Sequence, residues 1–160
     1  MNRSAIRLMP LAFGWEGAFH NFEVAGGPFD QRPRNGTYNI CLRAERIPPD
    51  AHAILPIEDF RTPANRDAVV SALKLAFSAL LAGKPVYVGC QGGLGRTGLF
   101  LALLAKVAGE TDPVRYVKQN YHAHAVETMD QMEYVRTFDV EPIRQWLFWQ
   151  TWTKRIFWWM

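Results

Sequence analysis

The chain of 160 residues fits a single domain, and its 49% hydrophobic content can bury a core without disulfide or metal staples. A formal charge of +3 suits an anionic ligand but falls short of the dense basic stripes typical of nucleic-acid binding, so no nucleic-acid partner is expected. The two cysteines lack the spacing of a zinc site or a disulfide framework. We therefore expect a domain in a reducing, cytoplasmic compartment, without a signal peptide or a membrane-spanning helix.

Glycines and prolines dominate residues 10–37, which predicts turns and loops with short strands between them. Further along, runs of β-branched and aromatic residues predict strands, whereas apolar residues at helical spacing predict helices. The first helix should be long and amphipathic, capped by Thr62 with Pro63 in its first turn, and should end at Gly83. The expected strands are Thr37 to Arg43, His52 to Ile57 and Pro85 to Gly89, and the expected later helices are Leu99 to Gly109, one from Asp112 and one from Thr128.

This order of elements predicts an α/β fold with a central, mostly parallel sheet flanked by helices. Any ligand should lie at the carboxyl ends of the strands. The stretch VYVGCQGGLGRTG, Val86 to Gly98, lies at such an end, because it leads from a buried strand into closely spaced glycines. We expect one domain over residues 1–140, followed by an aromatic-rich helical extension over residues 141–160.

The glycines of this stretch match two nucleotide-binding motifs, both weakly. Gly93 to Gly98 fits G-x-G-x-x-G, but that fingerprint starts directly after the strand and needs an acidic residue ending a second strand about 20 residues on. Here residues 90–92 intervene, and the downstream segment predicts a helix. Cys90 to Thr97 nearly fits the nucleotide-triphosphate loop, but cysteine and arginine replace its first glycine and its lysine, the two positions that matter.

An anion-binding site accounts for every residue of the stretch. A strand-loop-helix junction points consecutive backbone N–H groups into a concavity, and the helix N-terminus adds about half a positive charge. Arg96 offers a planar fork of donors that matches two phosphate oxygens. Cys90, at the base of the loop, would feel the same positive field, which favours a thiolate over a thiol. An ionised nucleophile facing a bound phosphate predicts a phosphatase site.

On these residues the sequence resembles the cysteine-dependent protein tyrosine and dual-specificity phosphatases, whose signature is C-x5-R-[ST]. In this chain the signature consists of Cys90, then QGGLG, then Arg96 and Thr97. The chain departs from the family at Gly89, since the family usually has a histidine directly before the cysteine. The resemblance implies the α/β fold of these phosphatases.

Two further segments resemble motifs of this family. PIEDFRTP, Pro56 to Pro63, resembles its movable acid loop, and the match makes Asp59 the general acid. AVETMDQMEYVRTF, Ala125 to Phe138, resembles the downstream segment whose glutamine positions water, and the match falls on Gln131. The three motifs, in the family's order, cover most of residues 38–138.

The resemblance implies in-line attack by Cys90 on phosphorus and a phosphocysteine intermediate, with Arg96 and the loop amides holding the equatorial oxygens. Asp59 would protonate the leaving oxygen and later act as a base toward water. Thr97 would hydrogen-bond the departing sulfur and Gln131 would orient the hydrolytic water, with no metal or cofactor required. The phosphate-binding residues would be Gln91, Gly92, Gly93, Leu94, Gly95 and Arg96.

Three of these residues have plainer alternative roles. Asp59 competes with Glu58 for the role of acid and could instead cap the following helix. Thr97 could cap the helix that starts there. Thr128 and Gln131 stand at capping-box spacing, which predicts hydrogen bonds at a helix N-terminus rather than a role in catalysis.

The cysteines and the arginine also have structural alternatives. A buried free cysteine is ordinarily inert packing, and Arg96 could be plain surface charge, although neither explains the glycines between them. Cys41, on its predicted strand, is expected in the core. A Cys41–Cys90 disulfide that protects the nucleophile is a further hypothesis.

The tail RQWLFWQTWTKRIFWWM contains five of the six tryptophans. Trp146, Trp149, Trp152 and Ile156 recur at near-helical spacing, with arginine and lysine between them. This pattern favours a final helix that packs on the domain or is buried in a homodimer. The alternative is a helix that docks on a partner or a membrane surface, where tryptophan and basic residues are favoured.

The expected function is phosphomonoester hydrolysis, most of all on phosphotyrosine in a phosphorylated protein substrate. Phosphoserine and phosphothreonine, phosphoinositides and RNA 5′-phosphates are alternative substrates. A non-catalytic phosphate-binding module is a further alternative, against which the combination of Cys90, Arg96 and Asp59 argues.

Overall fold

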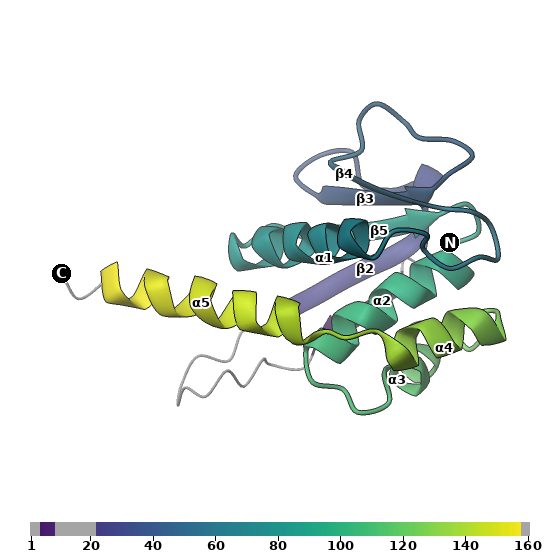
Figure 1. The fold of residues 1–160 in the computed structure, drawn as a ribbon. Coiled ribbons are helices and arrows are strands. Elements are labelled where there is room, and N and C mark those ends of the chain that lie inside the picture. Colours follow the sequence, from purple (N-terminus) through teal and green to yellow (C-terminus); the bar gives the residue numbers. More distant parts are fainter. Residues whose placement is uncertain (1–3, 9–21, 158–160) are drawn as a thin grey trace.

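The computed structural model describes residues 4–8 and 22–157 of the chain. Five strands form one sheet in the order β1-β2-β5-β3-β4 (Figure 1). The last four of these run parallel to one another, and β1 pairs antiparallel with β2. The predicted central, mostly parallel sheet is therefore confirmed. The strands are β1 (Ser4–Leu8), β2 (Phe22–Pro28), β3 (Tyr38–Arg43), β4 (Ala53–Ile57) and β5 (Val86–Cys90).

Strand β5 is central, and all of its residues are buried. It pairs with β2 on one side, where Pro28 lies opposite Cys90, and with β3 on the other, where Cys41 lies opposite Gly89. Because these three strands are parallel, their carboxyl ends meet at one edge of the sheet. This edge is where a ligand is expected in an open α/β sheet.

Helices α1 and α2 lie on the same face of the sheet (Figure 1). Phe77 of α1 packs edge-on against Phe22, and a Cβ at Gly26 would lie 3.0 Å from both Leu101 and Thr97 of α2. Helices α3 and α4 pack on α2, whereas α5 contacts both α1 and α2. The helices are α1 (Arg66–Leu81), α2 (Gly95–Val107), α3 (Pro113–Asn120), α4 (Met129–Thr137) and α5 (Glu141–Phe157), with a 3-10 turn, η1, at Phe29–Gln31.

The prediction that Thr62 caps the first helix is wrong. Helix α1 begins at Arg66, and its N-cap is Asn65, whose side chain accepts a hydrogen bond from a backbone N–H of the first turn. The reason is local, since asparagine is preferred over threonine at the N-cap. Before this cap, the carbonyl of Arg61 accepts a hydrogen bond from the Gln131 side chain at 3.1 Å. This contact with α4 holds the preceding residues as a loop.

The other helix starts differ less from expectation. Helix α2 begins at Gly95, before the predicted Leu99, because the glycine loop passes directly into its first turn. Asp112 caps α3, as predicted from its position before a proline. The capping box of Thr128 and Gln131 at the start of α4 is confirmed.

Helix α5 packs on the domain through its first two turns and then extends beyond the sheet (Figure 1). Its inward residues are Ile143 and Leu147, both fully buried. Of the predicted tryptophan stripe, Trp146 is partly buried against the core, whereas Trp149 and Trp152 are 58% and 37% exposed. The side of the helix rich in tryptophan is therefore largely the outer side.

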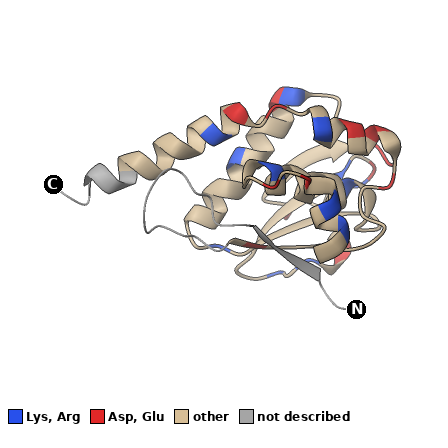
Figure 2. Ribbon diagram, turned by 90° about the horizontal axis from the view of Figure 1, so that it is seen from below, with Lys and Arg blue, Asp and Glu red and all other residues tan. Residues whose placement is uncertain are grey.

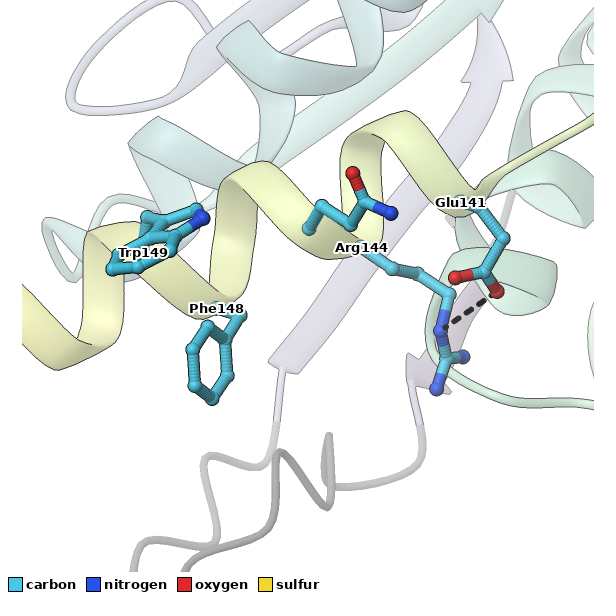
Figure 3. Close-up of a pocket in the computed structure, with 5 residues that line it drawn as sticks. Glu141, Arg144, Phe148 and Trp149 are labelled. Carbon is cyan, nitrogen blue, oxygen red and sulfur yellow. Dashed lines mark ion pairs between the residues drawn. The ribbon is translucent and has the colours of Figure 1, made fainter.

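A shallow pocket on α5 contains none of the predicted site residues (Figure 3). Arg144 in this pocket pairs with Glu141 at 3.7 Å, and its Nη1 donates to the Val107 carbonyl. Phe148 and Trp149 complete the lining with Gln145. Ile156 is also predicted at this helical spacing, but its side chain is not among those that the structure describes. In the part of the chain that the structure describes, no helix is long and apolar enough to cross a membrane.

Candidate active site

The loop from Cys90 to Arg96, here called the phosphate loop, joins β5 to α2 at the carboxyl edge of the sheet. Gly93 adopts a positive φ of 78°, and a Cβ at this position would lie 2.5 Å from the carbonyl carbon of Gly27. The loop therefore needs glycine here for both its conformation and its close approach to β2. Apart from Gly92 itself and its chain neighbours, no described atom lies within 4 Å of the corresponding position at Gly92.

The residue before the cysteine is glycine because the end of β2 and η1 leave no room for a side chain. A Cβ at Gly89 would lie 2.7 Å from Phe29 Cα and 2.8 Å from the Phe29 backbone nitrogen. Both atoms belong to the backbone and cannot rotate away. This packing explains why the chain lacks a histidine at the position where the family usually has one.

The sulfur of Cys90 lies at the base of the loop, and the residue is only 3% exposed. It accepts hydrogen bonds from the Gly93 N–H at 3.2 Å and from the Thr97 hydroxyl at 3.1 Å. The Thr97 oxygen in turn accepts from the Cys90 N–H at 3.0 Å. The structure thus brings the predicted nucleophile and the predicted hydroxyl donor into contact.

Arg96 is 1% exposed and is held from three directions. Its Nη1 and Nη2 donate to the two carboxylate oxygens of Glu45 at 2.7 and 2.9 Å, and Nη1 also donates to the Ile57 carbonyl at 2.9 Å. Asp59 Oδ1 lies 3.3 Å from Nη2. Among the described atoms, the buried Nε has no hydrogen-bond partner.

Burial alone would lower the pKa of Arg96, but the hydrogen bonds that it donates to Glu45 and the charges of Cys90, Glu45 and Asp59 raise this pKa above its usual value. The guanidinium therefore stays charged. An orphan donor on a permanently charged, buried side chain is suited to an incoming anion.

Glu45 is a site residue that the sequence analysis missed. Its hydrogen bond with Arg96 lowers the pKa of this carboxyl to about 2, although its side chain is 44% exposed. The two residues are 51 positions apart, so no local motif links them. The available signal was its position just after β3, since the carboxyl ends of parallel strands meet at the ligand edge.

The predicted acid loop presents Asp59 to the phosphate loop. The Asp59 side chain is 57% exposed, and Oδ1 accepts from the Phe60 N–H at 3.1 Å while lying close to Arg96. Phe60 has a positive φ of 59°, which is strained for a bulky residue. Such strain at a turn that carries a carboxylate toward a cationic loop is typical of functional sites.

The side-chain amide of Gln131 is engaged on both sides and is fully buried. Its Oε1 accepts from the backbone N–H groups of Glu127 and Thr128 at 3.0 and 3.3 Å, and its Nε2 donates to the Arg61 carbonyl. Gln131 therefore connects the acid loop to α4. The segment Ala125 to Phe138 also places a carboxylate beside the phosphate loop. This carboxylate belongs to Glu127, whose Oε2 occupies the space that a Cβ at Gly95 would need.

A second buried arginine holds the start of the loop. Arg43, at the end of β3, donates from Nη1 to the side-chain oxygen of Gln91 at 3.2 Å and to Asp30 at 3.1 Å. Its guanidinium carbon lies 5.4 Å from the centre of the Phe29 ring. These contacts connect the first residue after the nucleophile to the neighbouring strand and to η1.

The register of the sheet argues against the hypothesis of a Cys41–Cys90 disulfide. Cys41 lies opposite Gly89, so its side chain points to the face of the sheet opposite to that of Cys90. Both cysteines are free and buried. The expectation that Cys41 is a core residue is confirmed, since it is fully buried.

Comparisons with known proteins agree with this geometry. Residues 42–110 match a family model described as a polymorphic toxin system DSP-PTPase phosphatase. Two uncharacterised proteins of Methanocaldococcus jannaschii are 40% and 41% identical to the chain over 86 and 83 residues. These alignments cover 52% and 51% of this chain and 56% and 50% of the relatives, so the chain spans about half the length of the curated relatives it matches.

Solved structures share the fold at low sequence identity. Tk-PTP in its active form has a TM-score of 0.59 and 23% identity over 72% of this chain and 88% of its own. Kinase associated phosphatase has a TM-score of 0.56 and 19% identity over 84% and 94%. TpbA of P. aeruginosa has a TM-score of 0.53 and 22% identity over 78% and 84%.

The fold is thus that of the protein tyrosine phosphatases. Taken with the family model over residues 42–110, it confirms the resemblance to the cysteine-dependent tyrosine and dual-specificity phosphatases.

Proposed function

We propose that the chain hydrolyses phosphomonoesters through a phosphocysteine intermediate, with phosphotyrosine in proteins as the first substrate class. One observation carries the proposal. The Cys90 sulfur accepts hydrogen bonds from the Gly93 amide and the Thr97 hydroxyl at the base of a glycine loop that Arg96 closes. An anionic sulfur in this position faces the place where a phosphate would bind.

In the first step the Cys90 thiolate attacks phosphorus as the bond to the leaving oxygen breaks. Asp59 donates its proton to that oxygen, so that an alcohol or phenol departs and the phosphoryl group remains on sulfur. The loop amides of residues 91–95 and the free Nε of Arg96 hold the equatorial oxygens. Glu45 fixes the plane of the guanidinium through its two hydrogen bonds.

In the second step water attacks the phosphocysteine and releases orthophosphate. The Asp59 carboxylate takes the proton from this water, which restores the acid for the next cycle. The sulfur departs as a thiolate, and the Thr97 hydroxyl stabilises it by the hydrogen bond already present. In this proposal Gln131 orients the water, although its amide also holds Arg61 of the acid loop.

The same proposal includes the class of substrate and the cellular compartment of the protein. A tyrosine phosphate is favoured because the nucleophile is buried at the base of its loop, where a long side chain reaches it more easily than serine. Phosphoserine, phosphothreonine, phosphoinositides and RNA 5′-phosphates are the competing classes. The two free thiols, Cys41 and Cys90, suit a reducing compartment such as the cytoplasm.

The test compares wild type with Cys90→Ser on a phosphotyrosine peptide. The variant should bind the peptide yet release no orthophosphate, because a serine hydroxyl is not ionised at neutral pH. Cys41→Ser is the matched control, since Cys41 lies on the opposite face of the sheet, and it should retain activity. Phosphate release by Cys90→Ser at the wild-type rate contradicts the mechanism.

The same assay with phosphoserine peptides, phosphoinositide micelles and 5′-phosphorylated RNA identifies the substrate class. If the wild type binds these phosphates but hydrolyses none of them, the chain is a phosphate-binding module rather than an enzyme.

A contact through the C-terminal helix stays a prediction, and the comparisons give it no support. It rests on the exposure of Trp149 and Trp152. The double variant Trp149→Ala, Trp152→Ala tests it better than a deletion, because removing Ile143 and Leu147 would open the core. Unchanged sedimentation with liposomes and an unchanged oligomeric state in the double variant would exclude the membrane contact and the homodimer contact.

A further inference from the structure

The outer side of the phosphate loop is held by the segment that joins α3 to α4. Tyr121 directly follows α3, and its hydroxyl donates to the Gly93 carbonyl at 2.6 Å. The Val126 N–H donates to the next carbonyl, that of Leu94, at 3.3 Å. Two consecutive carbonyls of the loop are therefore bonded by this segment.

Packing enforces the position of this segment. Val126 is fully buried with a positive φ of 59°, a conformation that is strained for a β-branched residue and persists only where the surroundings impose it. A Cβ at Gly98, in the first turns of α2, would lie 2.6 Å from the Val126 nitrogen. The segment is thus pressed against the helix that carries Arg96.

The Tyr121 bond determines where the next amide points. In a trans peptide the C=O and N–H groups point in opposite directions, so the Tyr121 hydroxyl, by holding the Gly93 carbonyl, also fixes the direction of the Leu94 N–H. Gly93, at a φ of 78°, has no Cβ to restrain the rotation of this peptide unit. The hydroxyl of Tyr121 supplies the restraint that the glycine lacks.

We infer that Tyr121 is a positioning residue of the phosphate loop, which acts through the Gly93–Leu94 peptide to keep one more amide directed at the bound phosphate. The inference rests on the proposed function, because it assumes that the loop binds phosphate. Burial, and then the charge of Cys90, raises the pKa of Tyr121 well above its usual value. The phenol therefore remains a donor at neutral and alkaline pH.

The test compares wild type, Tyr121→Phe and Tyr134→Phe, each as the full chain. The phenylalanine variant keeps the ring and removes only the hydroxyl. Tyr134, partly buried on α4, is the matched control for loss of a tyrosine hydroxyl elsewhere in the core. The readout is the concentration of orthophosphate that half-protects Cys90 from iodoacetamide.

Tyr121→Phe should need about five- to tenfold more orthophosphate than wild type, as expected for weakening one hydrogen bond to a charged group, and Tyr134→Phe should not differ. Protection of Tyr121→Phe within twofold of wild type overturns the inference.

Two further measurements distinguish this inference from a general loss of stability and from a failure of the proposed function. The increase in melting temperature that orthophosphate causes should be smaller in Tyr121→Phe, and an equal increase contradicts the inference even if the variant is less stable. The protection assay does not depend on turnover. An inactive wild type that orthophosphate still protects would refute the proposed hydrolysis alone, whereas failure of orthophosphate to protect the wild type refutes the positioning role.

Discussion

The two loops that meet at Arg96 are built in opposite ways. In the phosphate loop, Cys90 and Arg96 are 3% and 1% exposed, and the sulfur is bonded to the loop itself. In the acid loop, the Asp59 side chain is 57% exposed, and Phe60 is 58% exposed with a positive φ. The loop proposed to bind phosphate is thus part of the core, whereas the loop proposed to supply the proton faces solvent.

This difference separates two kinds of effect. Changes in the phosphate loop should alter anion binding, catalysis and stability together, because the same buried bonds serve all three. Changes in the acid loop should alter catalysis with little effect on binding or stability. The acid loop approaches the site through the Ile57 carbonyl on Arg96 and the Arg61 carbonyl on Gln131.

The largest effect is expected from Arg96→Lys. Lysine keeps the charge but loses the planar fork that pairs with Glu45 and leaves Nε for phosphate, so kcat/KM on a phosphotyrosine peptide should fall about a thousandfold. The control is Arg115→Lys, at an exposed position on α3, which should leave kcat/KM unchanged. A loss of less than tenfold would mean that the fork is not required.

Gly89→Ala should destabilise the domain by about 2–3 kcal/mol, because its methyl group would meet the backbone of Phe29. Gly92→Ala, in the same loop but with open space around it, should leave stability within about 0.5 kcal/mol of wild type. Urea unfolding of the two variants measures the difference. Equal stabilities would show that η1 moves aside at no cost.

Asp59→Asn should lower kcat about a hundredfold and leave KM nearly unchanged, as expected for loss of a general acid. The loss should be smaller on p-nitrophenyl phosphate, whose leaving group needs less protonation. Glu58→Gln is the neighbouring control. If the Glu58 variant shows the larger loss, the acid role belongs to Glu58 instead.

The smallest effect concerns the Glu45 carboxyl, whose pKa of about 2 lies below the ordinary value of 4.5. A carboxyl with a lowered folded-state pKa stabilises the fold above its unfolded pKa, and this contribution is lost as the pH falls from about 4.5 to about 2. Because the side chain is partly exposed, the change should be modest. The urea midpoint of unfolding should therefore differ less between pH 7 and pH 3 in Glu45→Gln than in wild type. In the control Glu110→Gln, the difference between the two midpoints should equal that of wild type.

The phosphate loop could be predicted from sequence because its determinants are local. Cys90, the glycines and Arg96 lie within seven consecutive positions between a strand and a helix that their own patterns define. The parallel sheet follows from the same alternation of elements. Asp59 could be located by its motif, and the structure places it beside Arg96.

What could not be predicted depends on contacts between distant segments. Glu45 reaches Arg96 across 51 positions, and Tyr121 reaches Gly93 across 28. Gln131 holds the carbonyl of Arg61 from 70 positions away. In each case the local pattern is compatible with more than one outcome, and tertiary packing selects one of them.

The tail shows a further limit of periodicity. Tryptophans at helical spacing predicted the helix correctly, but spacing alone does not determine which side faces the core. Ile143 and Leu147 occupy the buried positions, and Trp149 is left largely exposed.

The strand register also bears on oxidative damage. A sulfenic acid on Cys90 would need a second thiol to form a reversible disulfide, and Cys41, the only other cysteine in these 160 residues, points to the other face of the sheet. Recovery from peroxide should therefore depend on an external reductant such as glutathione. Without one, oxidation should advance to the irreversible sulfinic acid.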